Sequence, residues 1–353
     1  MVHWLQHKKW ERIYKWKGFL VLSWCLLVNW SWSPSPVTEQ SNLCAASVGV
    51  GGRHHRCRHL GGFVDARTVF INQNYATFLV QNEILLNEDL EFKSLNSTAL
   101  IGVEIRVTNC SLGGSSNITL RVNMSSESQF IVEQNSFNEG GLQFAPTTFF
   151  YATTFVIQSN IKNSTLLGPG SFVQFAYNTF GDGTRILFYN NTASVTQASG
   201  GSGADSASFL IGFRYCRFFA SSASGVNVLQ YVMNTFRVTG APNKRYVSTI
   251  FYLQTALESV NILYQSNLID DRNANTVDYV YALLYLRSPI TNSHAVQYMN
   301  NQLTTNGKGN VFANYYSSSP ITNVSMVQYL NTTITTTGNN IYSISYHYSP
   351  ITN

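Results

Sequence analysis

The segment VQYMNNQL at residues 296–303 returns as VQYLNTTI at residues 327–334. Aligned, the two give a template of apolar, any, apolar, any, any, Asn-like, any, apolar. Side chains alternate between the faces of a β-strand, so the first and third template positions lie on one face. The chain must turn two residues later, where the Asn-like position lies. The template therefore predicts a short strand, a corner and another short strand.

The template recurs along the chain. Its Asn-like position falls at Asn74, Cys110, Asn135, Asn160, Asn178, Cys216, Asn234, Asn267, Asn301 and Thr332. Steps between these positions are 36, 25, 25, 18, 38, 18, 33, 34 and 31 residues. Three SPIT segments, beginning at Ser288, Ser319 and Ser349, are spaced by 31 and then 30 residues. Periods of this order are typical of solenoids, in which each repeat stacks on its neighbours.

A unit of short strands cannot bury its apolar face alone, but stacked coils can, with every strand paired in parallel. The sequence therefore predicts an all-β parallel β-helix over residues 65–353. The inward Asn side chains are expected to adopt the corner backbone and to hydrogen-bond between coils. The apolar positions predict an inward stack of Tyr231, Tyr264, Tyr298 and Tyr329. A β-propeller and a β-sandwich are the alternatives; regular Asn-Gly or Asp-Gly hairpin signals are missing, and a sandwich would not explain the SPIT repeat.

Composition supports strands and argues against nucleic-acid binding. Charged residues make up only 11% of the chain, and the polar share comes from Asn, Ser, Thr and Gln. Helix is therefore expected mainly at residues 5–30. Residues 1–67 hold nine Lys/Arg against three acids, a net +6, whereas the remainder has 13 against 14, a net −1. A nucleic-acid reader would spread its basic residues over the folded surface.

The N-terminus predicts export. The basic stretch KKWERIYKWK precedes the apolar run GFLVLSWCLLVNW at residues 18–30, which fits a signal peptide. No clean cleavage site follows, so residues 1–33 are either a signal peptide or a membrane anchor. Residues 34–64 are expected to be a linker rich in Pro and Ser, then in Gly, Arg and His. The predicted location is secreted or at the cell surface.

Glycosylation motifs and cysteines agree with an oxidising compartment. N-x-[ST] motifs occur at Asn96, Asn109, Asn117, Asn123, Asn163, Asn190, Asn323 and Asn331. Beyond the apolar run there are four cysteines. Cys110 and Cys216 occupy template corners at different levels of the stack, so they are not expected to pair with each other. A disulfide, if formed, is expected between Cys44 and Cys57.

The template variants FIVEQNSF and LQYVMNTF resemble right-handed, pectin-lyase-like β-helix proteins. More narrowly, they resemble the dispersed gene family surface proteins of trypanosomes, over roughly residues 65–353. The resemblance implies a cell-surface or secreted glycoprotein of right-handed β-helical fold with no established enzymatic activity. This chain is shorter than those proteins and lacks their C-terminal membrane spans. Since it stops at SPITN, where another coil should begin, we expect it to be part of a longer protein.

Enzymes also use this fold, so carboxylates must be considered. A glycoside hydrolase needs two carboxylates facing each other across the bond. The densest acidic group is Asp270, Asp271 and Asp278, for which a polar loop between coils is the simpler interpretation. The segment GGRHHRCRHLGG at residues 51–62 holds possible zinc ligands, but their spacing matches no standard site and its arginines would repel a cation.

The sequence thus favours a non-enzymatic surface glycoprotein that uses its β-helix for adhesion or recognition. The expected partners are host or matrix glycans or proteins, with membrane association possible through residues 18–30. A polysaccharide lyase or glycoside hydrolase of the pectin-lyase-like class is the alternative. No cofactor or metal is expected.

Overall fold

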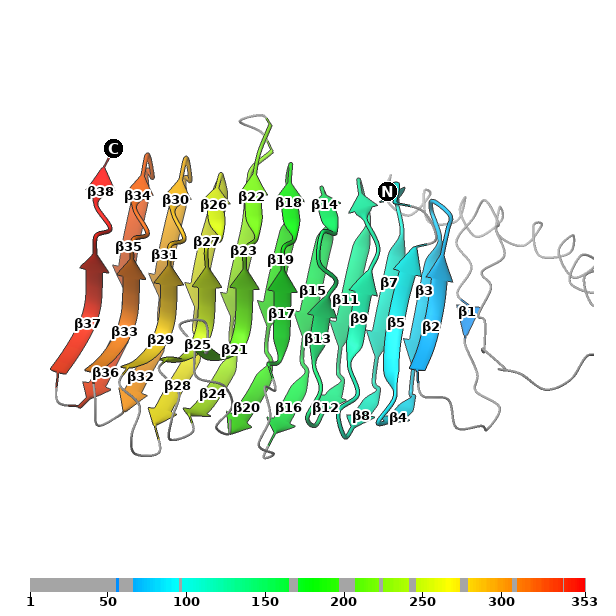
Figure 1. Cartoon of the computed structure of the whole chain (residues 1–353), viewed down its shortest axis with the longest axis horizontal. Coiled ribbons are helices and arrows are strands. Elements are labelled where there is room, and N and C mark those ends of the chain that lie inside the picture. Colours follow the sequence, from blue (N-terminus) through cyan, green and yellow to red (C-terminus); the bar gives the residue numbers. More distant parts are fainter. Residues whose placement is uncertain are drawn as a thin grey trace, which may run out of the picture. The chain divides into compact units, whose positions relative to one another are not determined.

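The computed structural model describes residues 55–56, 66–94, 97–164, 171–196, 207–221, 225–240, 246–273, 279–306, 310–338 and 340–352. The 38 elements in these ranges are all β-strands, and every strand pairing is parallel. The strands form four long sheets, here called A, B, C and D, that run side by side (Figure 1). This is the architecture of a parallel β-helix, and the prediction of that fold is confirmed. The right-handed winding and the N-terminal helix stay predictions, and residues 5–30 lie outside the described residues.

From β3 onward, each strand of sheet A is followed along the chain by a strand of sheet C. Sheet A contains β1 (His55–Arg56), β3 (Thr77–Gln81), β7 (Glu104–Thr108), β11 (Gln129–Glu133), β15 (Thr154–Gln158), β19 (Arg185–Tyr189), β23 (Asn227–Val232), β27 (Val260–Gln265), β31 (Ala295–Met299) and β35 (Met326–Leu330). Sheet C contains β4 (Ile84–Leu86), β8 (Ser111–Gly113), β12 (Ser136–Phe137), β16 (Ile161–Ser164), β20 (Thr192–Thr196), β24 (Thr235–Gly240), β28 (Leu268–Asn273), β32 (Gln302–Asn306) and β36 (Thr333–Thr337).

Sheets B and D complete each coil. Sheet B contains β2 (Ala66–Ile71), β5 (Asp89–Ser94), β9 (Ile118–Arg121), β13 (Leu142–Phe144), β17 (Val173–Ala176), β21 (Ala207–Arg214), β25 (Tyr246–Leu253), β29 (Tyr279–Leu286), β33 (Asn310–Ser317) and β37 (Asn340–His347). Sheet D contains β6 (Leu100–Ile101), β10 (Met124–Ser125), β14 (Phe149–Tyr151), β18 (Thr179–Gly181), β22 (Arg217–Phe219), β26 (Ala256–Glu258), β30 (Ile290–Thr291), β34 (Ile321–Thr322) and β38 (Ile351–Thr352).

One coil passes through the sheets in the order A, C, B, D, as β31, β32, β33 and β34 do. We number the coils by their sheet-A strand, from coil 1 at β3 to coil 9 at β35. Coil length varies, since register partners are 25 residues apart from Ile105 to Phe130 but 43 apart from Ile186 to Leu229. The fold tolerates this variation because added residues can lie in loops at the corners without disturbing the stacked strands.

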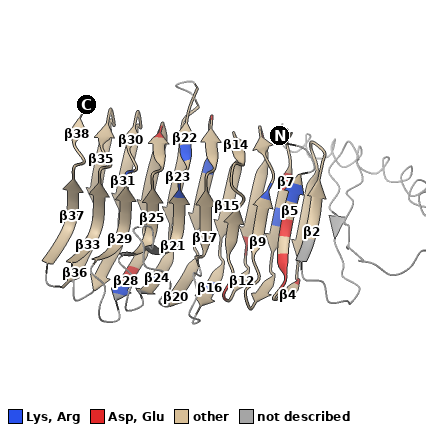
Figure 2. Ribbon diagram, viewed as in Figure 1, with Lys and Arg blue, Asp and Glu red and all other residues tan. Residues whose placement is uncertain are grey.

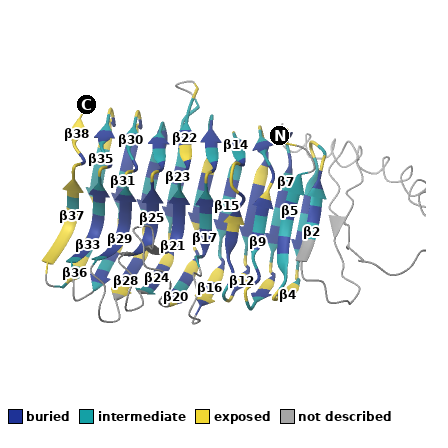
Figure 3. Cartoon of the chain, viewed as in Figure 1, coloured by how far each residue is buried: buried dark blue, intermediate teal, exposed yellow. Residues whose placement is uncertain are grey.

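Alternation of inward apolar and outward polar residues places the core inside the coil (Figure 3). Strand β27 reads VNILYQ and alternates strictly between buried and half-buried positions, as expected for a strand with one face in the core. Strand β29 does not alternate: six of its eight residues are buried, because both of its faces are covered by apolar side chains.

The sequence interpretation assigned the unusual corner backbone to the inward Asn itself, and this is wrong. The residue before it carries the positive φ: 57° at Gln134, 52° at Ser159 and 54° at Asn300. These left-handed residues point outward, and the inward side chain follows one position later. The linker prediction also needs a correction at one point, because His55–Arg56 pair with β3 as a two-residue strand of sheet A.

Candidate functional site

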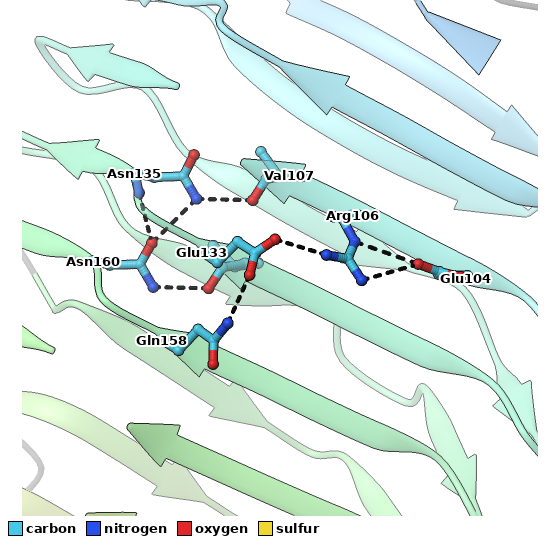
Figure 4. A network of polar contacts seen from close by, with 8 residues as sticks. Glu104, Arg106, Val107, Glu133, Asn135, Gln158 and Asn160 are labelled. Atoms are coloured by element: carbon cyan, nitrogen blue, oxygen red, sulfur yellow. Dashed lines mark hydrogen bonds and ion pairs between the residues drawn. The ribbon is translucent and has the colours of Figure 1, made fainter. Parts of the chain in front are cut away.

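A column of inward polar side chains runs along the corner between sheets A and C. We call it the asparagine column; its members are Cys110, Asn135, Asn160, Asn191, Asn234, Asn267, Asn301 and Thr332. Figure 4 shows the pattern: Asn135 Nδ2 donates to Asn160 Oδ1 at 3.1 Å and to the Val107 carbonyl at 2.9 Å. The same Asn160 Oδ1 also accepts a hydrogen bond from the backbone N–H of Asn135 at 3.0 Å. Each side chain thus satisfies the corner backbone of neighbouring coils, as buried polar groups require.

The column includes one residue that the template search missed and excludes three that it assigned. Asn191, in ILFYNNTA, fits the template and bonds Asn234 Oδ1 at 2.9 Å. Asn178 and Cys216 lie instead at the corner between sheets B and D. Asn74 follows β2, is exposed, and accepts the Ile101 amide at 2.9 Å. With these changes the steps are 25, 25, 31, 43, 33, 34 and 31 residues, and each is one coil.

The SPIT repeat has its explanation at the second corner. There a serine–threonine column follows sheet B; its members are Thr148, Asn178, Cys216, Thr255, Ser288, Ser319 and Ser349. The Ser288 amide donates to Ser319 Oγ at 2.9 Å, and the Ser319 amide donates to Ser349 Oγ at 2.8 Å. The first residue of each SPIT segment therefore bridges successive coils at this corner.

The two described cysteines lie in different columns. Cys110 belongs to coil 2 and Cys216 to coil 5, and both are buried. Three coils of ~4.8 Å put them roughly 14 Å apart along the axis, beyond the reach of a disulfide. Burial raises the pKa of the Cys216 thiol to about 12, so at neutral pH it is a protonated core residue. Cys44 and Cys57 lie outside the described residues.

The glycosylation motifs fall on the surface wherever the structure describes them. Asn109, Asn190 and Asn331 occupy the exposed left-handed position of the corner between sheets A and C. Asn163 and Asn323 are exposed, whereas Asn117 and Asn123 are half-buried and hydrogen-bonded through Nδ2. Asn96 lies outside the described residues. The exposed positions could carry glycans without opening the core.

Asp270 and Asp271 do not face each other across a groove. Asp270 and Asp271 lie in β28 rather than in a loop, and as consecutive strand residues they point to opposite faces of sheet C. Asp270 faces outward and pairs with Arg237 at 3.0 Å and Arg272 at 2.8 Å. Asp271 faces the core and is fully buried. Asp278 lies outside the described residues. Groups of three or more His, Cys, Asp or Glu side chains able to hold a metal are missing from the described ranges.

Two tyrosine columns fill the core of the last four coils. The sheet-A column is Tyr231, Tyr264, Tyr298 and Tyr329, stacked at 4.4–4.8 Å as predicted; the sheet-B column is Tyr252, Tyr285, Tyr316 and Tyr346. Their hydroxyl groups alternate between the columns: Tyr264 bonds Tyr252 at 2.9 Å and Tyr285 at 2.8 Å. Burial is the main cause that raises the pKa of Tyr264 well above its ordinary value. Sequence reasoning missed the sheet-B column and hence the hydroxyl chain.

A second apolar cluster covers the outer surface of sheet B. We call it the aromatic face; it is formed by Phe209, Phe251, Leu253, Tyr281, Leu284 and Phe312, with Tyr215, Tyr279, Leu286 and Tyr315 packed at its edge. Tyr281 lies 5.0 Å from the rings of Phe312 and Tyr315, and Phe312 stacks on Tyr342 at 4.7 Å. Gly212 makes room at its start, since a Cβ there would lie 2.2 Å from the Phe209 ring. The centre is buried, whereas Tyr279, Tyr315 and Tyr342 are partly exposed.

The aromatic face is free of charged residues on its last three strands, whereas Arg214 of β21 is the register partner of Leu253 at its start. Strands β29, β33 and β37 contain no Lys, Arg, Asp or Glu, whereas ion pairs such as Arg106–Glu133 (2.8 Å) and Arg121–Glu91 (2.8 Å) cross the outer surface of the early coils (Figure 2). Outward glutamines lie on two sheets, with Gln174 on sheet B and Gln297 bonded to Gln328 at 3.0 Å on sheet A. A ligand bound over β29, β33 and β37 would therefore meet rings, hydroxyls and amides of these strands rather than charges.

In the described part of the chain there is no helix long and apolar enough to cross a membrane. Comparisons with protein-family models, with curated proteins and with solved structures gave no match.

Proposed function

We propose that this protein is a non-enzymatic, exported or cell-surface glycoprotein whose β-helix recognises uncharged glycans through the aromatic face. The observation that supports this function is the row of contacting rings on β29, β33 and β37, strands that carry hydroxyl and amide side chains and no charged residue of their own. The apolar faces of sugar rings pack on aromatic rings, while nearby polar groups bond the sugar hydroxyls.

The charge pattern selects among glycans. Anionic polysaccharides are held by Arg and Lys, which pair with carboxylates or sulfates. Strands β29, β33 and β37 offer neither residue. A neutral polysaccharide can bind this surface without burying a charged group. An acidic polysaccharide would bury carboxylates or sulfates without a basic partner, which costs binding free energy. The proposed ligand class is therefore a neutral polysaccharide.

Export and surface location rest on the sequence features. The apolar run at residues 18–30 would direct the chain to the secretory route, and the exposed motifs at Asn109, Asn163 and Asn190 would accept glycans. The resemblance to the dispersed gene family surface proteins favours the same location, with an adhesive role towards host or matrix partners.

Co-sedimentation with insoluble polysaccharides tests the proposal. The purified protein should bind neutral particles such as cellulose, chitin or β-1,3-glucan, and should bind polygalacturonate gel at least tenfold more weakly. The double variant Tyr279→Ala/Tyr315→Ala should reduce binding at least tenfold. The control Tyr189→Ala removes an exposed ring of sheet A, and should bind like the wild type.

Equal binding by the wild type and the double variant would contradict the assignment of the aromatic face, as would a preference for polygalacturonate. Release of soluble reducing or unsaturated sugars during incubation would instead favour the polysaccharide lyase or hydrolase alternative.

A further inference from the structure

Among the described residues, Asp271 is an acidic side chain of the core that Thr249 approaches with its backbone and its hydroxyl, but neither contact has good hydrogen-bond geometry. Asp271 is fully buried in β28, and neither of its carboxylate oxygens has a hydrogen-bond partner. Burial, followed by the charge of Asp270, raises the pKa of Asp271 well above its ordinary value. A buried carboxylate needs a compensating partner, because transfer of an unpaired charge out of water costs several kcal/mol.

Two further oxygen atoms without partners lie on neighbouring strands. Thr305 is the register partner of Asp271 in the next coil, and its buried hydroxyl has no partner. Thr249, on β25, lies against the carboxyl group from sheet B, and its hydroxyl is also buried without a hydrogen bond of good geometry. Four oxygen atoms, carried by three side chains from three successive coils, therefore lie in one region of the core without a hydrogen bond of good geometry.

The repeat itself shows that this set is a local departure from the pattern. At the Asp271 position the two preceding coils carry Val195 and Val238, both buried apolar residues. Across the core, sheet B carries Leu210 in coil 5 but Thr249, Ala282 and Ala313 in coils 6–8. The side chains on sheet B thus become small or polar over the same coils in which the side chains on sheet C become polar.

Among the described residues, the core also holds a buried cationic side chain, and the chain treats it differently. The Lys162 ammonium group, on β16, donates to the carbonyl oxygens of Asn138 and Glu139 at 3.0 Å each, and also to that of Gly140. The chain thus supplies a complete set of acceptors for its buried cation. It supplies no equivalent for Asp271, because Arg237 and Arg272 both lie on the outer side of sheet C, bound to Asp270.

We propose that Asp271, Thr249 and Thr305 bind a single monovalent metal cation, sodium or potassium, inside the β-helix. Carboxylate and hydroxyl oxygens are the ligands that hard cations prefer. A single positive charge neutralises the single carboxylate, whereas a divalent ion would leave an excess charge buried in the core. Since the site is enclosed by stacked coils, the cation enters as the coils assemble, and its binding contributes to folding.

Thermal unfolding in matched salts tests the site. The full chain is refolded and melted in NaCl, KCl or N-methyl-D-glucamine chloride at one pH and one ionic strength. The melting temperature in the preferred metal salt should exceed that in the organic-cation salt by about 5 °C, the shift expected for a ligand present far above its Kd. The large organic cation cannot enter the core.

Three variants show which side chain causes the difference between salts. Asp271→Asn keeps the size of the side chain and removes its charge, and should abolish the difference between salts. Asp270→Asn, the adjacent outward carboxylate, should keep it. Thr305→Val preserves the charge and shape, so it should fold and show a reduced difference. A melting temperature independent of cation identity in the wild type would overturn the proposal and leave a protonated Asp271 with ordered water. A salt difference that persists in Asp271→Asn would also overturn it.

Discussion

The early and late coils share one fold but fill it with different aromatic cores. In coils 3 and 4 the rings are phenylalanines, many packed edge to face, as in Phe130–Phe144 at 82° and Phe144–Phe155 at 78°. From coil 6 onward they are tyrosines in nearly parallel stacks, 3° apart for Tyr231–Tyr264. Phenylalanine has no polar atom to satisfy, so its packing is free to vary. Phenylalanines that follow one another along a sheet can also be nearly parallel, as Phe144 and Phe175 are at 18°. What the tyrosines add is a set of buried hydroxyls, which must find hydrogen-bond partners.

The change occurs in both columns at once. Sheet A passes from Phe188 to Tyr231, and sheet B passes from Phe213 to Tyr252, between coils 5 and 6. A tyrosine in only one column would bury a hydroxyl without its partner. Because both columns change together, Tyr231 and Tyr252 bond at 3.0 Å and begin the hydroxyl chain.

The largest expected difference between the two regions is in alkaline stability. Burial raises the pKa of Tyr231, Tyr285 and Tyr298 well above the ordinary value. Their folded state holds protons that the unfolded state loses, so their contribution is complete below pH ~10 and is lost as pH rises above it. We expect the late coils to unfold first, with tyrosinate absorbance of the column residues rising only as circular dichroism changes.

Limited proteolysis at the pH where the circular dichroism begins to change shows which coils unfold first. First cleavages among the late coils would agree with this expectation. Cleavage first in the phenylalanine coils would contradict it, as would an ordinary tyrosine titration of the column residues without loss of structure.

The second largest effect is expected when one tyrosine ring of the late coils is removed. Tyr298→Ala removes a ring stacked on Tyr264 and Tyr329 and a hydroxyl that bonds Tyr316 at 2.7 Å. The free energy of unfolding should fall by roughly 3–5 kcal/mol, as for other buried aromatic truncations. Tyr298→Phe, which removes only the hydroxyl, should cost about 1–2 kcal/mol. Urea unfolding of the three proteins measures both, and a loss below about 1 kcal/mol for Tyr298→Ala would mean that the stack contributes little.

The smallest effect is expected on the outer surface of the early coils. Arg106 pairs with Glu133 at 2.8 Å and with Glu104 at 3.3 Å, and its side chain is 38% exposed. Arg106→Gln should therefore change the free energy of unfolding by less than about 1 kcal/mol, and high salt should remove most of the difference. A larger loss that salt does not reduce would show that Arg106 stabilises by packing rather than by charge.

The sequence could predict the kind of fold because every coil must present similar inward residues to its neighbours. Repetition of the apolar positions around Tyr264, Tyr298 and Tyr329 was sufficient to predict parallel coils and the stack of their rings. It could not assign each polar corner. Strands of sheets A and B both end in an apolar, any, apolar pattern followed by an inward polar residue, so Asn160 and Asn178 look alike locally, although they lie at different corners of one coil.

By itself the sequence determined the strand pattern, the inward Asn and Tyr residues, and the scarcity of charge. Only the tertiary structure decided which residues share a column and which face becomes a surface. The reason is register: two adjacent residues of sheet B, such as Ala282 and Leu283, both point inward, and this bulge turns Tyr281 and Leu284 outward into the aromatic face. Local alternation cannot reveal such a shift, because it depends on how each coil stacks on the next.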